Sequence, residues 1–191
     1  MHYICFYLLV CDISLLFGNN MNYTLNKATA RNGSIFNTGV NVELTKEKNF
    51  EINPIQISDI INLDKIGQYG NKKIGYLMYN QFVSNKSHEL NQVFENFKNE
   101  GVSEIIIDLR YNGGGSIKNC VELASMITGQ FTNEIFAEEQ WNNKLLPYLR
   151  NNFGKETLIN RFRAVLEDGE EINSLNLNRV FIITTSESAS A

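Results

Sequence analysis

Residues that could do chemistry gather in residues 104–116, EIIIDLRYNGGGS. Three isoleucines lead to charges at Asp108 and Arg110, then to Asn112 and three glycines. The isoleucine run predicts a strand buried on both faces. Glycine lets other atoms approach backbone N–H groups closely, and Ser116 begins a helical pattern whose N-terminus favours negative charge. The turn is therefore either an oxyanion hole or anion cradle, or a flexible strand-to-helix connection.

A second stretch, residues 180–191, reads VFIITTSESASA, an apolar strand that ends in small and hydroxyl residues. A buried strand that runs into such residues usually leads to a helix or a site. A serine hydroxyl is weakly nucleophilic and needs a base to attack a carbonyl. The stretch is thus a candidate source of a nucleophile, provided that another segment supplies the base.

Composition excludes several other chemistries. The chain has 191 residues, a net charge of −4 and 43% hydrophobic residues, which gives no reason to expect nucleic acid as a partner. Three cysteines make neither a disulfide framework nor a metal site, and two histidines give no reason to expect a zinc site or a local Ser-His-Asp triad. The apolar run at residues 3–11 is too short to span a bilayer. It is either a targeting segment or a buried element of a neighbouring module, which leaves membrane association open.

The elements that must position these residues follow from periodicity. A strand at residues 74–79, an amphipathic helix at 88–99, the isoleucine strand and a helix at 118–128 predict a βαβ unit in a mostly parallel sheet. Before it, alternating segments flank a hairpin turn at Arg31-Asn32-Gly33. After it, we expect a strand at 134–138, a helix at 141–151 that Pro147 bends or interrupts, a strand at 162–166, and the apolar strand at 179–185.

Taken together, IIIDLRYNGGGS, VFIITTSESASA and the earlier KIGYLMYNQF resemble the tail-specific or C-terminal processing peptidases. The resemblance covers residues 73–191. It implies serine peptidases with a Ser-Lys dyad on a crotonase/ClpP-like α/β core, with a mostly parallel sheet, flanking helices and a β-rich N-terminal remnant. The implied organisation is a remnant at residues 1–70, resembling the end of a PDZ-like module plus a connector, and a peptidase core at residues 71–191 that is incomplete at its C-terminus.

The family pattern carries specific roles onto this sequence. It implies that the nucleophile is Ser190, with Ser188 and Ser186 as alternatives. The implied oxyanion donors are the N–H groups of Ala191 and of one glycine, with Gly114 preferred over Gly113 and Gly115. Asp108, Arg110 and Asn112 are expected to support the turn. The lysine base of the family lies beyond Ala191, and neither Lys118 nor His88 matches it; both are predicted to lie on solvated surfaces.

The resemblance implies a serine peptidase that acts on a peptide or protein substrate near its C-terminus, with no cofactor, no metal and no nucleic acid. It also implies a location in the cell envelope or periplasm. One alternative is a catalytically inactive relative that binds peptides or acts as a scaffold. A crotonase-like acyl-CoA enzyme, which shares the core, is a third hypothesis.

Overall fold

The structure is a computed structural model that describes residues 18–48, 51, 53–64, 70, 72–186 and 188. It divides into two compact units, Met1–Ile52 and Asn53–Ala191. Ser190 and Ala191, and the apolar run at residues 3–11, lie outside the described residues. No helix among the described residues is long and apolar enough to cross a membrane.

The first unit holds one antiparallel hairpin, β1 (Asn22–Arg31) paired with β2 (Ser34–Thr45). Asn32 and Gly33 connect the strands with φ angles of 49° and 77°. Positive φ at both central residues is the geometry that Asn-Gly favours in two-residue hairpin turns, because its twist matches that of the strands. The predicted hairpin turn is therefore confirmed. Ile35, Phe36 and Val40 of β2 are exposed.

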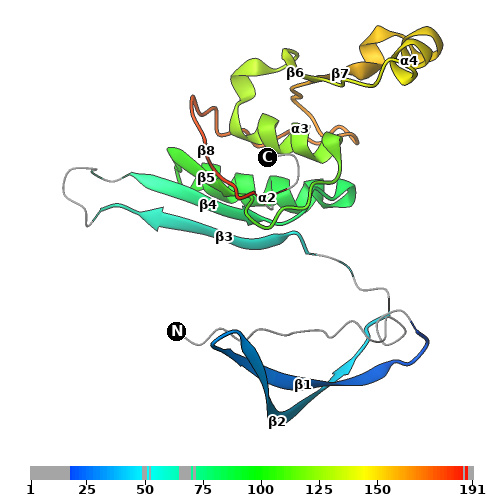
Figure 1. Cartoon of the computed structure of the whole chain (residues 1–191). Coiled ribbons are helices and arrows are strands. Elements are labelled where there is room, and N and C mark those ends of the chain that lie inside the picture. The colour runs from blue at the N-terminus through cyan, green and yellow to red at the C-terminus, as the bar shows by residue number, and fades with distance from the viewer. Residues whose placement is uncertain are drawn as a thin grey trace. The chain divides into compact units, whose positions relative to one another are not determined.

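The second unit is organised around a four-stranded sheet in the order β3-β4-β5-β8 (Figure 1). β4 (Lys73–Tyr79), β5 (Glu104–Asp108) and β8 (Phe181–Ile183) are parallel, and β3 (Ile55–Asn62) joins β4 in the antiparallel sense. The predicted mostly parallel sheet is confirmed. Because β3 pairs with β4, the core unit begins at Asn53, earlier than the predicted boundary at residue 71.

Two helices cover one face of this sheet. α2 (Ser87–Asn99) follows a short 3-10 turn at Ser84–Lys86 and ends before Gly101, whose φ of 71° permits the reversal. α3 (Ile117–Ile127) begins after Ser116, whose hydroxyl accepts a hydrogen bond from Asn119 N at 3.3 Å. The core joins alternate residues of β4 and β5 to the apolar faces of both helices: Leu77, Tyr79, Ile105, Ile107, Leu90, Phe94, Phe97, Leu123, Met126 and Ile127.

Burial of the isoleucine strand differs from the prediction. Ile105 and Ile107 are 0% and 1% exposed against the helices, whereas Ile106 on the other face is only half-buried. The prediction of burial on both faces is wrong, because both crossover helices pack on the same side of the sheet.

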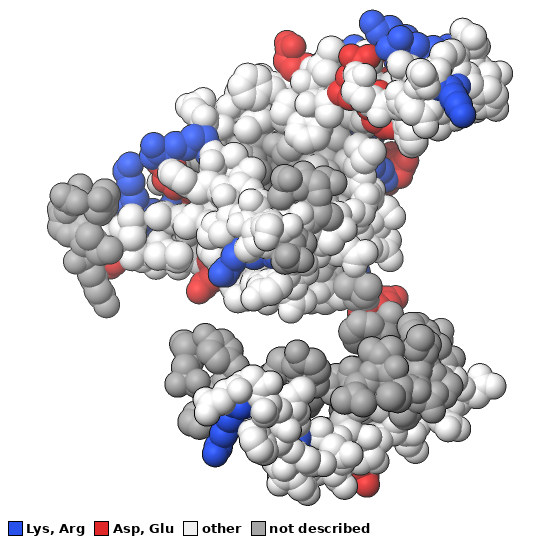
Figure 2. Space-filling view, viewed as in Figure 1, with Lys and Arg blue, Asp and Glu red and all other residues white. Residues whose placement is uncertain are grey.

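An arm between α3 and β8 extends away from the helices (Figure 1). Short antiparallel strands β6 (Ile135–Glu138) and β7 (Ile159–Arg161) form its stem. Between them lie α4 (Leu145–Phe153) and a 3-10 turn at Lys155–Leu158, and a further 3-10 turn at Gly129–Phe131 precedes them. Charged side chains of both signs cover the end of the arm (Figure 2).

Two predictions in this part of the chain are wrong in detail. Pro147 does not interrupt the helix, because α4 begins at Leu145 and places the proline in its first turn, where a missing N–H breaks no helical bond. The strand predicted at 162–166 is β7, at 159–161, followed by a single bridge between Val165 and Glu171.

β8 is shorter and less buried than predicted. Only Phe181–Ile183 of the predicted 179–185 pairs with β5, at the edge of the sheet. These three residues are 47%, 57% and 38% exposed, so the fully apolar sequence does not mark a buried strand here.

Candidate active site

The carboxyl ends of β4, β5 and β8 lie side by side at one end of the sheet, because the three strands are parallel neighbours. β4 leads to Asn80, β5 leads to the glycine turn, and β8 leads to Ser186 and Ser188. Ligands of parallel α/β sheets bind outside the carboxyl ends of the strands. The two motifs that the sequence analysis singled out therefore follow strands at the same end of one sheet.

An ion pair between a buried carboxylate and a partly exposed arginine holds the start of the glycine turn. The Asp108 side chain is 0% exposed and accepts hydrogen bonds from Arg110 Nη2 at 2.7 Å and from Arg110 Nε at 3.0 Å. Tyr76 donates its hydroxyl to Asp108 Oδ2 at 2.6 Å. The bonds from Arg110 hold the pKa of the Asp108 carboxyl at about 2, although burial acts to raise it. Asp108 is thus an ionised anchor rather than a proton donor.

Asn112 ties the turn to the neighbouring strand. Its side chain is buried and donates from Nδ2 to the Tyr79 carbonyl at 2.9 Å. Its Oδ1 accepts the Gly114 N–H at 2.7 Å. An aspartate could accept the second bond but could not make the first, because a carboxylate has no N–H donor.

The three glycines differ in what their backbones do. Gly113 donates its N–H to the Asn80 carbonyl at 3.3 Å, and Gly114 donates to Asn112. The N–H of Gly115 has no hydrogen bond within the described part of the chain. Gly115 has a φ of 134°, and a Cβ there would lie 2.1 Å from the Phe82 carbonyl oxygen. Close approach of residues 80–82 to the turn therefore requires glycine at this position.

That close approach is a short parallel ladder. Phe82 N donates to the Gly114 carbonyl at 2.9 Å, and Ser116 N donates to the Phe82 carbonyl at 2.8 Å. Sequence reasoning missed the role of Phe82, because nothing local in residues 80–83 indicates pairing with a turn more than thirty residues away.

Ser188 fastens the end of β8 to the end of β5. Its hydroxyl donates to the Leu109 carbonyl at 2.8 Å and accepts from Thr185 N at 3.1 Å. It also lies 3.3 Å from the Arg110 carbonyl, and the residue is 8% exposed. The serine-rich segment is thus in direct contact, at Ser188, with the residues that lead from β5 into the glycine turn.

The two basic residues weighed as possible bases point elsewhere. Lys118, on α3, forms an ion pair with Glu167. His88, at the start of α2, faces Glu170 with Nδ1 at 2.7 Å and Asp168 with Nε2 at 3.1 Å. The His88 imidazole and both carboxylates are half exposed. These contacts agree with the predicted solvated positions.

A buried polar chain connects β4 with both helices behind the turn. Tyr79 donates its hydroxyl to Asn119 Oδ1 at 2.7 Å, and Asn119 Nδ2 donates to Ser87 Oγ at 3.0 Å. Ser87 in turn donates to Glu122, whose side chain is fully buried. Burial raises the pKa of Tyr79 to about 12, so its hydroxyl stays protonated and available as a donor. This chain fixes the first turn of α3, which directly follows the glycines.

The fold is similar to that of a protein of known structure. A crystal structure of a Bacteroides fragilis protein assigned to the S41 proteases aligns with a TM-score of 0.58, at 22% identity, over 88% of this chain and 42% of that one. Residues 73–191 match the sequence profile of Peptidase family S41. The chain belongs to this family.

Two named relatives are similar to part of this chain. A carboxyl-terminal-processing protease of Picosynechococcus sp. is 27% identical over 116 residues, which cover 58% of this chain and 28% of the relative. The chloroplastic C-terminal processing peptidase of Tetradesmus obliquus is 25% identical over 130 residues, which cover 64% of this chain and 28% of the relative. The chain therefore aligns with less than a third of the length of these relatives.

Proposed function

We propose that this chain carries the nucleophile and the oxyanion donors of a serine peptidase that cleaves peptides near their C-termini. Ser190 is the nucleophile. The observation that carries this proposal is the hydrogen bond of 2.8 Å from Ser188 Oγ to the Leu109 carbonyl. Two residues of extended chain span at most about 7 Å. The proposal is that Ser190, two residues after Ser188, reaches the glycine turn that begins a few residues after Leu109.

The same contacts favour Ser190 over Ser188. Ser188 is buried, and its single hydroxyl proton is committed to a carbonyl oxygen. A nucleophile must instead present its oxygen to a substrate and its proton to a base. Ser188 is thus proposed as the residue that positions the segment, not as the residue that attacks.

In the proposed reaction, the Ser190 oxygen bonds to the scissile carbonyl carbon as its proton passes to the base. The resulting oxyanion takes hydrogen bonds from Ala191 N–H and from the turn. Gly115 is the favoured partner, because the N–H groups of Gly113 and Gly114 already have acceptors. The C–N bond then breaks, the amine takes up a proton, and water hydrolyses the Ser190 ester. The base is the lysine that the family resemblance puts after Ser190.

The test is covalent labelling. The chain, expressed with whatever its own reading frame encodes after Ala191, is treated with a fluorophosphonate probe and mapped by mass spectrometry. We expect the label on Ser190, none in Ser190→Ala, and slower labelling of Ser190 in Ser188→Ala. Label on Ser186 or Ser188 overturns the assignment of the nucleophile. If no label appears under conditions that label the Picosynechococcus relative, the proposal of peptidase activity is overturned.

An inactive peptide-binding relative gives a different result in the same preparation. Calorimetry with a peptide that has a free C-terminus would then show binding without any labelling. The specific location in the cell envelope and the PDZ-like nature of residues 1–70 stay predictions. The described part of residues 1–70 consists of the hairpin β1–β2, of β3, and of a few connecting residues.

A further inference from the structure

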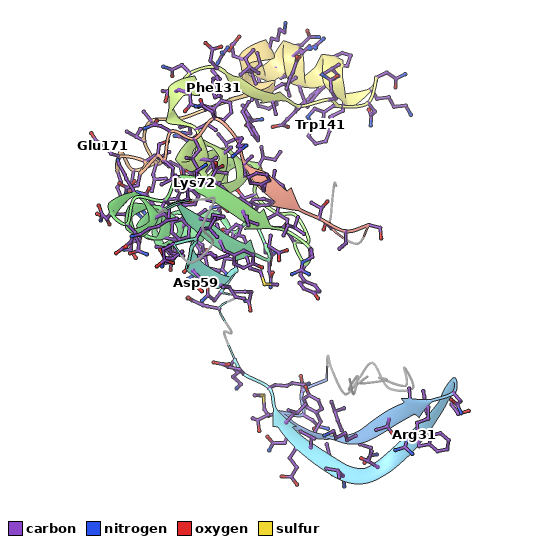
Figure 3. The ribbon with its side chains drawn as sticks, turned by 90° about the vertical axis from the view of Figure 1, so that its left-hand side faces the viewer. Arg31, Asp59, Lys72, Phe131, Trp141 and Glu171 are labelled. Atoms are coloured by element: carbon purple, nitrogen blue, oxygen red, sulfur yellow. The ribbon has the colours of Figure 1, made fainter. Side chains whose placement is uncertain are left out.

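A second site lies at the opposite end of the helices from the glycine turn. A cavity of about 230 Å³ opens where α2 and α3 end, and its walls come from both sides of the arm. Its lining residues are Lys98, Gly129, Thr132, Arg163, Ala164, Ile172, Ser174 and Asn176. Figure 3 labels Phe131 and Glu171, which adjoin two of these lining segments.

The charge of the lining is positive. Lys98 and Arg163 contribute cations, and none of the described residues that line the cavity is acidic. Lys98 Nζ has no hydrogen bond or ion pair within the described part of the chain. The nearest carboxylate oxygen to Arg163 is Glu122 Oε1, 4.0 Å from Nη1 and beyond hydrogen-bond distance. Arg163 thus forms a long ion pair with the buried Glu122. Lys98, and the N–H groups of Arg163 that do not face Glu122, can turn towards a ligand.

Neutral donors complete the lining. Ser174 Oγ accepts a bond from Asn176 N at 3.2 Å, which leaves its own hydroxyl proton uncommitted among the described residues. The side-chain amide of Asn176 likewise has no partner in that part of the structure. Both side chains close over Gly129, where a Cβ would lie 2.5 Å from Asn176 Oδ1 and 2.7 Å from Ser174 Oγ. Because residue 129 has no side chain, these two polar groups have room to line the cavity.

We propose that this cavity binds a small oxyanion, either a carboxylate or a phosphate group. Lysine, arginine, hydroxyl and amide donors are the groups that recognise such anions, and charge-assisted bonds from arginine are the strongest of them. The cavity is separate from the glycine turn, because Lys98 and Gly129 lie at the ends of the helices remote from Ser116. This inference does not depend on peptidase activity.

The experiment measures binding of sodium phosphate and sodium acetate to the full chain by calorimetry and by ¹H–¹⁵N spectra, at matched ionic strength against sodium chloride. We expect saturable shifts of the Gly129, Arg163 and Ser174 amides with at least one of the two anions. Stronger binding of phosphate would identify a phosphate ligand, and stronger binding of acetate a carboxylate.

Two substitutions test the assignment. Arg163→Gln should weaken binding by about tenfold to a hundredfold, since hydrogen bonds from charged donors contribute about 1.5–3 kcal/mol. Lys98→Gln, on the exposed last turn of α2, should weaken it without disturbing the fold. Lys144→Gln, at the start of α4, is the matched control and should leave the affinity unchanged. Equal affinity in the wild type, Arg163→Gln and Lys98→Gln would overturn the proposal, as would the absence of saturable binding of either anion.

Discussion

The sharpest stability prediction concerns Gly115. In Gly115→Ala, the new Cβ would lie 2.1 Å from the Phe82 carbonyl oxygen, at a φ of 134° that L-residues rarely adopt. The unfavourable dihedral costs about 1–3 kcal/mol, and forcing apart the packed backbones adds about 1–3 kcal/mol. We therefore expect the free energy of unfolding to fall by about 2–6 kcal/mol, a large fraction of the roughly 5–15 kcal/mol that a domain has.

Gly113→Ala is a matched control in the same turn. No atom lies within 4 Å of a Cβ built at Gly113, and its φ is outside the left-handed range. The substitution should leave stability unchanged or raise it by about 0.4–1 kcal/mol, because alanine restricts the unfolded chain. Urea unfolding followed by circular dichroism measures both variants. If Gly115→Ala lost less than about 0.5 kcal/mol, or if Gly113→Ala lost as much as Gly115→Ala, the described turn geometry would be refuted.

Three further predictions concern buried or paired polar groups. Tyr79→Phe should lower the unfolding free energy by about 1–3 kcal/mol, because it leaves the buried Asn119 oxygen without its donor. The pKa of Asp108 is depressed from 3.8 to about 2, chiefly by Arg110. Its stabilising contribution is therefore present above pH 4 and should be lost as the pH falls towards 2. The pKa of His88 is raised from 6.5, chiefly by the hydrogen bond with Glu170. Protonated His88 therefore stabilises the fold, by about 1 kcal/mol or less at an exposed site. This stabilisation should be complete below pH 6.5 and should be lost as the pH rises through the raised pKa.

Each of the three has its own control. Tyr148→Phe, on the exposed face of α4, should leave stability unchanged, and a loss equal to that of Tyr79→Phe would show that the hydroxyl bond is not the cause. Asp108→Asn should flatten the acid limb of the stability profile. His88→Gln should remove the pH dependence of stability near neutral pH. Unfolding curves that keep their wild-type pH dependence in these variants would contradict the described ion pairs.

Local sequence signals predicted the elements that lie next to the site. The amphipathic pattern of residues 88–99 indicated α2, the helical pattern that begins at Ser116 indicated α3, and the isoleucine run indicated β5. These signals succeed because helix period and β-branched runs act within a few residues. The parallel sheet followed from their order, since strands joined by helices pair in that way.

Long-range contacts set the features that the sequence did not predict. β3 belongs to the core sheet only because it pairs with β4, and its own pattern does not tell a core strand from a connector. The length and burial of β8 depend on β5 and on whether a layer covers it, which the RVFIITT pattern alone cannot indicate. Ser188 has three backbone groups of other residues around its hydroxyl, and no spacing rule connects residue 188 with residues 109 and 110.

The glycine turn shows why residue types alone left the oxyanion donor open. All three glycines have N–H groups at the same strand end, so residue chemistry alone does not distinguish them, and only the family pattern favoured Gly114. The structure distinguishes them by their partners: Asn80 for Gly113, Asn112 for Gly114, and none among the described residues for Gly115. A preorganised oxyanion hole needs donors that no protein acceptor must first release. If Gly114 were the donor, Asn112 Oδ1 would lose its 2.7 Å bond in every turnover, and Asn112→Ala would free that N–H and speed acylation. If Gly115 is the donor, the same substitution should only loosen the turn and slow labelling of Ser190, which the fluorophosphonate assay can measure.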